Sequence, residues 1–309
     1  MNQLCKLLSQ PLLSEAASAQ QKSLVTYTIS QLQQPQPAAH PYPNHKPEPS
    51  SMSSRPFPTI SLLESRNLLF ASGTTGLRTW EASLHLGNYL AWHPALIQGR
   101  SILELGAGTG YLSILCAKYL GAHAVLATDG SDGVVSSLAT NIGLNDLESS
   151  ARSSQSQAPF PSFPFSSLSQ IISVRDLIWG DALLGTDDPV VRAGTDIDMV
   201  LGADVTYDDS AHEPLATTFN ELLDRFPHVD ILIAATERNA KTMRAFLRTC
   251  DEAGLVVHMV EYELVPRDQQ MGPFYDDNVP IRLCFVKRKA GNEMGTPRER
   301  RDEHAVCTI

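Results

Sequence analysis

The segment 101–110, Ser-Ile-Leu-Glu-Leu-Gly-Ala-Gly-Thr-Gly, constrains the fold of this 309-residue chain more than any other. Its first five residues are typical of a short buried parallel strand, and residues 111–120 have the apolar spacing of a helix. Gly106, Gly108 and Gly110 stand between the two, where the absence of a Cβ lets the backbone approach a ligand closely. The pattern therefore predicts a strand–turn–helix unit that binds a ligand at its turn.

The spacing of this turn separates two classes of ligand. A dinucleotide-binding turn follows the pattern Gly-x-Gly-x-x-Gly, and its third glycine would fall at the position of Tyr111. Glu104, just ahead of the first glycine, offers a carboxylate that suits a cationic ligand better than a pyrophosphate. Asp129 ends the next apolar run about 20 residues after the glycines, where it can accept hydrogen bonds from ribose hydroxyls. The glycine turn could instead be a plain connecting turn, and Asp129 could instead cap the next helix.

Apolar runs of strand length alternate with stretches of helical spacing along most of the chain. Strands are expected near 101–105, 123–128, 171–176, 197–203, 230–235, 255–262 and 281–287. Helical spacing occurs near 60–70, 80–92, 110–120, 131–143, 210–225 and 239–253. This alternation predicts a parallel sheet with helices on both faces. Residues 263–280 hold prolines in place of a helix, so the last two strands should form an antiparallel hairpin.

The composition divides the chain into segments. Residues 1–33 have leucines spaced for two short helices, which predicts a helical N-terminal extension. Residues 34–58 are rich in Pro, His and Ser and are interpreted as a linker. The main domain spans 59–288, and within it 149–169, rich in Ser, Pro and Phe, is expected to be a disordered surface insert. Residues 289–309 form a charged tail.

Candidate site residues follow the predicted strands. Parallel α/β sheets bind ligands at the carboxyl ends of their strands, beside the switch in strand order. The candidates there are Glu104, Gly106, Ala107, Gly108, Gly110, Asp129, Trp179, Asp181, Ala203, Asp204 and Tyr207, with Glu237 and Arg238 as weaker substrate-side candidates. Trp179, beside a glycine, is well placed to stack on an adenine ring, and Ala203 would offer its backbone.

Four further segments occur in a specific order with the glycine turn. They are Thr-Trp-Glu-Ala at 79–82, Leu-Ile-Trp-Gly-Asp at 177–181, Gly-Ala-Asp-Val-Thr-Tyr-Asp at 202–208 and Thr-Glu-Arg-Asn at 236–239. The series resembles class I seven-strand S-adenosylmethionine-dependent methyltransferases and, more narrowly, the eukaryotic protein-lysine methyltransferases of the family-16 group. Within that group, the extension and the series Arg-Thr-Trp-Glu-Ala-Ser at 78–83 are most similar to elongation factor 2 lysine methyltransferases. The resemblance spans 60–288 without the insert.

The resemblance implies a Rossmann-like seven-strand sheet, mostly parallel, with S-adenosylmethionine as cofactor. It implies that Trp80 lies at the cofactor and that Asp204 and Tyr207 act on the acceptor lysine. A lysine must lose its proton before it attacks a methyl group, since its pKa is about 10.4. Asp204 could orient the amine, and Tyr207 could bond to Asp204 or wall the lysine channel. Asp208 and Asp209 lie in the same turn, so the choice of carboxylate is left open.

Charge and composition bear on the partners. Residues 56–286 carry 14 basic and 28 acidic side chains, a net charge of −14. Such a domain repels a phosphate backbone and attracts a basic protein segment, which argues against a nucleic-acid substrate. No apolar run reaches the ~18 residues of a membrane span, and the first 13 residues make a poor signal peptide. The cysteines and histidines lack paired ligand spacing, so no structural metal is expected.

The sequence therefore predicts a cytoplasmic, monomeric protein-lysine methyltransferase that uses S-adenosylmethionine and acts on a lysine of elongation factor 2. One alternative is a methyltransferase for another protein or a small amine. The other is a cofactor-binding interaction protein without turnover, against which Asp204, Tyr207 and the unbroken glycine turn argue.

Overall fold

A computed structural model describes residues 22–33, 57–65, 75–153, 167–181 and 196–289. Its centre is a seven-stranded sheet with the spatial order β5-β4-β3-β6-β7-β9-β8. The strands are β3 (Ser101–Leu105), β4 (Ala124–Asp129), β5 (Ile172–Asp176), β6 (Met199–Ala203), β7 (Asp230–Thr236), β8 (Leu255–Val260) and β9 (Ile281–Arg288). The strands from β5 to β7 are parallel, and β9 runs antiparallel to both β7 and β8. The predicted sheet, with its final antiparallel hairpin, is confirmed.

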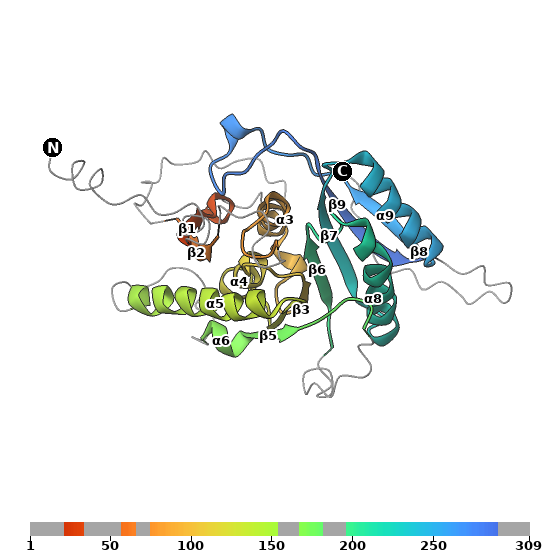
Figure 1. Cartoon of the computed structure of the whole chain (residues 1–309). Coiled ribbons are helices and arrows are strands. Elements are labelled where there is room, and N and C mark those ends of the chain that lie inside the picture. Colours follow the sequence, from red (N-terminus) through yellow and green to blue (C-terminus); the bar gives the residue numbers. More distant parts are fainter. Residues whose placement is uncertain (1–21, 34–56, 66–74, 154–166, 182–195, 290–309) are drawn as a thin grey trace, which may run out of the picture.

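Helices cover both faces of this sheet (Figure 1). The α-helices are α3 (Glu81–Trp92), α4 (Tyr111–Lys118), α5 (Asp132–Ser153), α6 (Leu168–Ile171), α8 (His212–Arg225) and α9 (Ala240–Glu252). Short 3-10 turns are η1 (Ser30–Gln33), η2 (Pro94–Leu96), η4 (Asp209–Ala211) and η5 (Arg267–Gln269). Helices α3, α4 and α5 lie on one face, and α8 and α9 lie on the other.

Side chains of the central strands alternate between two apolar cores. In β7, Leu232 and Ala234 pack into the core beneath α3 and α4, whereas Ile231 and Ile233 pack against α8 and α9. This alternation follows from the two-residue period of a strand. Burial on both faces holds the sheet rigidly, so the loops that follow β3 and β6, at the switch in strand order, have fixed starting points.

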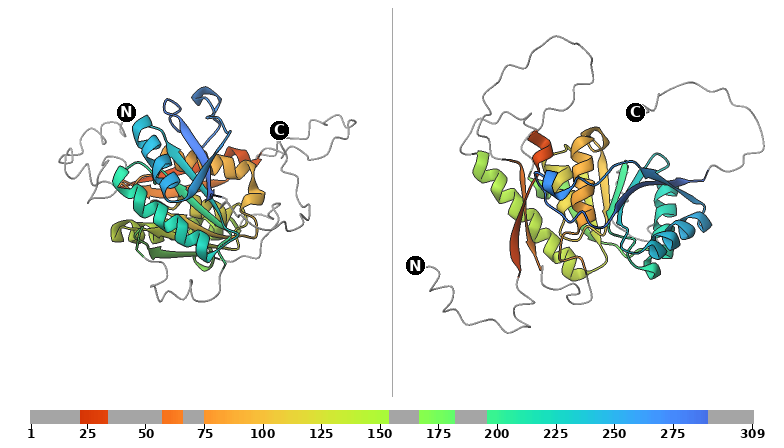
Figure 2. Two further views of the ribbon diagram at one scale, coloured as in Figure 1. Left: turned by 90° about the vertical axis from the view of Figure 1, so that its right-hand side faces the viewer. Right: turned by 90° about the horizontal axis from the view of Figure 1, so that it is seen from above.

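The N-terminal part of the chain differs from the prediction. Strand β1 (Ser23–Thr28) pairs antiparallel with β2 (Thr59–Glu64) in a separate two-stranded sheet, so the helices predicted within 1–33 and 60–70 are wrong where the structure describes them. The sheet lies beside α5, on the far side from α8 and α9 (Figure 2). Amide oxygens of Asn141 and Asn145 accept the N–H groups of Leu63 and Ser61 at 2.8 and 3.2 Å. Helix α5 thereby pairs the outer edge of β2, which a local leucine pattern does not reveal.

The predicted insert also begins and ends in helix. Helix α5 continues through residues 149–153, ten residues beyond its expected end, and α6 begins at Leu168. The Ser167 hydroxyl donates to the Asp146 carboxylate at 2.7 Å, which ties α6 to α5. Residues 154–166 of the insert lie outside the described residues. So do residues 1–21, residues 34–56 and the tail beyond Lys289. None of the described helices is long and apolar enough to cross a membrane.

Candidate active site

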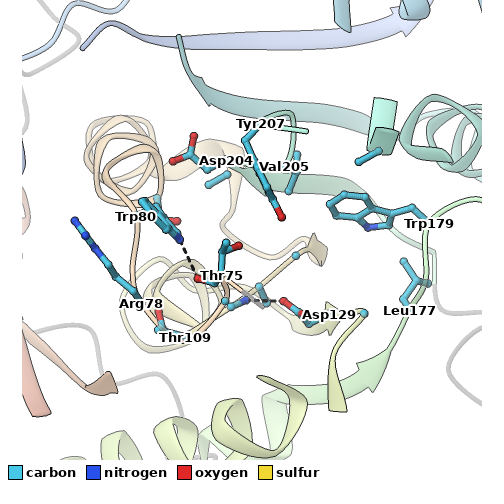
Figure 3. A pocket seen from close by; sticks show the side chains of 18 of the residues that line it. Thr75, Arg78, Trp80, Thr109, Asp129, Leu177, Trp179, Asp204, Val205 and Tyr207 are labelled. Atoms are coloured by element: carbon cyan, nitrogen blue, oxygen red, sulfur yellow. Dashed lines mark hydrogen bonds between the residues drawn. The ribbon is translucent and has the colours of Figure 1, made fainter. Parts of the chain in front are cut away.

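A cavity of about 410 Å³ opens at the carboxyl ends of β3, β4 and β6 (Figure 3). Its volume falls in the range of small-molecule and cofactor sites. Nine predicted site residues line it: Trp80, Gly106, Ala107, Gly108, Asp129, Trp179, Ala203, Asp204 and Tyr207. We call the part formed by the glycine turn, Asp129 and Trp179 the turn side, and the part formed by Trp80, Asp204 and Tyr207 the charged side.

The turn side is built from backbone. Gly106 and Gly108 have φ values of 63° and 55°, which L side chains rarely adopt. A Cβ on Gly108 would stand 3.2 Å from the carbonyl oxygen of Gly76. The Asp129 carboxylate accepts the N–H groups of Gly108 and Ser131 at 3.1 and 3.2 Å. Burial raises the pKa of Asp129, and these N–H groups oppose the shift. The turn side is therefore a wall of backbone, to which Asp129 adds one fixed hydrogen-bond acceptor.

Glu104 and Gly110 do not reach this cavity. The Glu104 carboxylate lies behind the turn, where it accepts the Ser113 hydroxyl and, at 2.9 Å, the Ser113 N–H in the first turn of α4. Burial raises its pKa to about 7. The predicted contact between Glu104 and a cationic ligand is therefore replaced by a contact that anchors α4. Gly110, with φ 86°, precedes α4, and a Cβ there would overlap Leu138.

A chain of buried polar groups supports the turn from β2. The Glu64 carboxylate accepts the hydroxyls of Tyr27 and Thr79 at 2.9 and 2.6 Å. The Thr79 hydroxyl also lies 2.6 Å from that of Thr109 in the glycine turn, whose carbonyl accepts the Asn141 amide at 2.9 Å. Sequence reasoning missed these residues, because they come from five separate segments and share no local pattern. They link the N-terminal sheet to the cavity wall.

Trp179 forms the wall opposite Trp80 (Figure 3). Its ring lies 3.4 Å from where a Cβ on Gly106 would be, so the glycine makes room for the indole. The Gly180 N–H donates to the Thr218 hydroxyl at 3.0 Å, which fixes the turn that carries Trp179 to α8. Asp181 follows this turn and is not among the cavity residues. The position of Trp179 would let a flat ring stack against it.

Asp204 is the carboxylate on the charged side. Its φ of 55° is rare for a residue other than glycine, and this conformation sits directly after β6. The backbone N–H donates to Ala234 at 2.8 Å, Oδ1 accepts the Thr236 N–H at 3.0 Å, and Oδ2 accepts Arg238 at 3.0 Å. Strain of this kind persists only where surrounding bonds enforce it.

The neighbouring acids point elsewhere. Asp208 is exposed and accepts the Ser210 N–H and hydroxyl at 2.9 and 2.8 Å, which lowers its pKa. Neither Asp208 nor Asp209 lines the cavity, so Asp204 is the one of these three acids that does. Tyr207 is half exposed and points into the cavity between Asp204 and Trp179 (Figure 3). Its hydroxyl forms no hydrogen bond with Asp204, so Tyr207 acts as a wall in this structure.

Trp80 is held by charged neighbours. Its indole N–H donates to the Thr75 carbonyl at 3.0 Å. The guanidinium carbons of Arg78 and Arg238 lie 4.8 and 5.0 Å from its ring centroid, within cation–π range. Arg238, a weak candidate from the sequence, thus contacts both Trp80 and Asp204. The described residues contain no cluster of His, Cys, Asp or Glu suited to a metal ion.

Comparison with known proteins supplies the chemistry of this family. A model described as "Lysine methyltransferase" matches residues 70–157 and 164–253, which is more than half of the chain. The chain belongs to the lysine methyltransferase family. It is accordingly a lysine methyltransferase, and the family's methyl donor is S-adenosylmethionine.

Two relatives known by sequence agree with this assignment. The chain is 42% identical over 288 residues to the protein-lysine N-methyltransferase EFM3 of Chaetomium thermophilum, covering 93% of this chain and 74% of that protein. It is 27% identical to the protein-lysine N-methyltransferase EEF2KMT of Mus musculus, covering 74% of this chain and 63% of that relative. A solved S-adenosylmethionine-dependent methyltransferase from Aquifex aeolicus is 13% identical, with a TM-score of 0.43 over 66% of this chain and 90% of that one.

Proposed function

We propose that this lysine methyltransferase transfers the methyl group of S-adenosylmethionine to a lysine of translation elongation factor 2, with both reactants meeting in the 410 Å³ cavity. The observation that carries the proposal is that a glycine-built wall with Asp129 lies across one cavity from a second carboxylate, Asp204. The amino-acid sequence of residues 78–83 and the similarity to the relative named EEF2KMT support the choice of substrate.

The turn side fits the cofactor. S-adenosylmethionine supplies an electrophilic methyl group on a sulfonium centre. The cradle at Gly108, which a Cβ would narrow against Gly76, leaves room for the cofactor against bare backbone. Asp129 retains acceptor capacity for ribose hydroxyls, Trp179 would stack on adenine, and Ala203 would offer its backbone.

The charged side would hold the acceptor lysine. The amine must reach the methyl group as a neutral nucleophile, and withdrawal from water favours loss of its proton. Asp204 also stabilises an ammonium, which opposes that loss, so its contribution is to orient the amine rather than to act as a base. Trp80 and Tyr207 would line the path of the lysine side chain and exclude water.

Purified elongation factor 2 and labelled S-adenosylmethionine test the proposal. The full chain should add methyl groups to one lysine, located by tandem mass spectrometry of proteolytic peptides. Elongation factor 2 that already carries the modification is the control and should accept little label. Absence of label from unmodified elongation factor 2, while the enzyme binds cofactor, would reject this substrate.

A further inference from the structure

Four charged side chains form a closed cluster around Trp80. Arg78 pairs with Glu81 at 2.8 Å, and Arg238 pairs with Asp204 at 3.0 Å. The Nη2 atom of Arg238 is also 4.0 Å from Glu81. Two guanidinium groups and two carboxylates therefore balance each other. Removal of Arg238 alone would leave this site with one uncompensated negative charge and an open aromatic face.

Arg238 covers the part of Asp204 that a ligand would meet. The Asp204 side chain is only 6% exposed, and its Oδ1 is engaged by the Thr236 N–H. Arg238 donates to the other oxygen, Oδ2, at 3.0 Å and more weakly to Oδ1 at 3.5 Å, and its guanidinium lies near the ring of Trp80. A carboxylate oxygen and an aromatic face are also what a lysine ammonium selects, so the two cations would compete for one place.

Arg238 is free to leave. Its side chain is 42% exposed, and it lies in the short segment between β7 and α9. A second cavity of about 60 Å³, lined by Arg238 and also by Tyr207, adjoins the first and gives the side chain room to move. Only the arginine end of this pair reaches solvent, and an incoming lysine ammonium would replace the positive charge that the buried Asp204 loses when Arg238 leaves.

We propose that Arg238 is a gate on the acceptor site. It occupies the place of the substrate lysine in the free enzyme and swings away when that lysine binds, which restores the charge balance of the cluster. The gate rests on the proposed function only in naming the cation that displaces Arg238. Such a gate would select against weakly bound amines, because an amine must displace the Arg238 guanidinium before it can reach Asp204.

A binding experiment tests the gate without turnover. The probe is n-butylammonium, a mimic of the lysine side chain, and the readout is the NMR signal of the Trp80 indole N–H, assigned with Trp80→Phe. In the presence of S-adenosylmethionine, the probe should shift this signal in full-length Arg238→Ala at concentrations about tenfold below those needed in the wild type. Arg282→Ala, which removes a similarly exposed arginine paired with Glu237, should match the wild type. Equal titrations in wild type and Arg238→Ala would overturn the gate.

Kinetics separate the gate from a supporting role. Arg238→Ala should lower the KM for elongation factor 2 by about 3- to 10-fold with little change in kcat, and cofactor affinity should stay constant. Low millimolar guanidinium should then inhibit the variant competitively with the protein substrate. A fall in kcat that guanidinium restores would instead make Arg238 a positioning residue for Asp204 and reject the gate. If the wild type does not methylate elongation factor 2, the proposed substrate fails, and the NMR titration still decides on the gate.

Discussion

The two sides of the cavity are built in opposite ways. On the turn side, the shape comes from backbone with positive φ, and buried bonds from Asp129, Thr79 and Asn141 hold it. On the charged side, the shape comes from partly exposed ion pairs around Trp80 that can exchange partners. One wall of the cavity is therefore fixed by backbone geometry, whereas the other is formed by charged side chains whose pairing can change.

The largest effect is expected from the backbone cradle. Gly108→Arg should weaken S-adenosylmethionine binding by at least about 100-fold, because the side chain fills the cradle and strains a positive φ. Calorimetry on the folded variant measures this. Gly99→Arg is the matched control, since Gly99 also has a positive φ of 73° but nothing within 4 Å of its Cβ position. Undiminished affinity in Gly108→Arg would place the cofactor elsewhere.

Asp204→Ala should separate the two sides. We expect cofactor affinity to stay within a few-fold of the wild type while methyl transfer falls by roughly 10²-fold, the scale of a lost orienting contact. Calorimetry and single-turnover assays provide the two readouts. Asp208→Ala should keep both, because Asp208 caps an exposed turn. Loss of transfer in Asp208→Ala but not in Asp204→Ala would identify the other carboxylate as the functional one.

Truncation tests how far the rigid wall extends. Deletion of 1–33 removes β1 and the Tyr27 hydroxyl that bonds to Glu64, so cofactor affinity should fall roughly tenfold, from a loss of about 1–2 kcal/mol. Deletion of 1–21 leaves β1 intact and should retain the affinity. Tyr27→Phe provides a milder test if the longer truncation does not fold. Normal cofactor affinity in both truncations and in Tyr27→Phe would show that β1 does not support the turn.

Glu104 gives the smallest effect, in the pH dependence of stability. Its pKa is about 7 in the folded protein, above the usual 4.5, so the folded state keeps a proton that the unfolded chain releases. The contribution of Glu104 to stability is therefore present below pH 4.5 and is lost as the pH rises towards 7. In thermal unfolding experiments, the wild type should lose stability relative to Glu104→Gln as the pH rises from 4.5 to 7. A constant difference would refute the raised pKa.

The sequence predicted that the glycine turn, Asp129 and Asp204 lie at one edge of the sheet, because all of them follow strand ends, where a local pattern fixes position. It misplaced Glu104, although strand alternation puts Glu104 on the same face as the buried Ile102, directed towards α4. The leucine spacing of the two segments indicates helix, whereas the Val, Thr, Tyr and Ile content of β1 and β2 favours strand, and the two segments pair as strands. The pair of Asp204 with Arg238 joins residues 34 positions apart, and no spacing rule relates them.

We propose above that one cavity brings a cofactor and a lysine of elongation factor 2 together. An extract from cells that lack this protein, incubated with labelled S-adenosylmethionine and the full chain, tests it without choosing the substrate beforehand. We predict one strongly labelled band, identified by mass spectrometry as elongation factor 2, which is absent when Asp204→Ala replaces the wild type. Label in a different protein, or only in small molecules, would reject elongation factor 2 as the substrate.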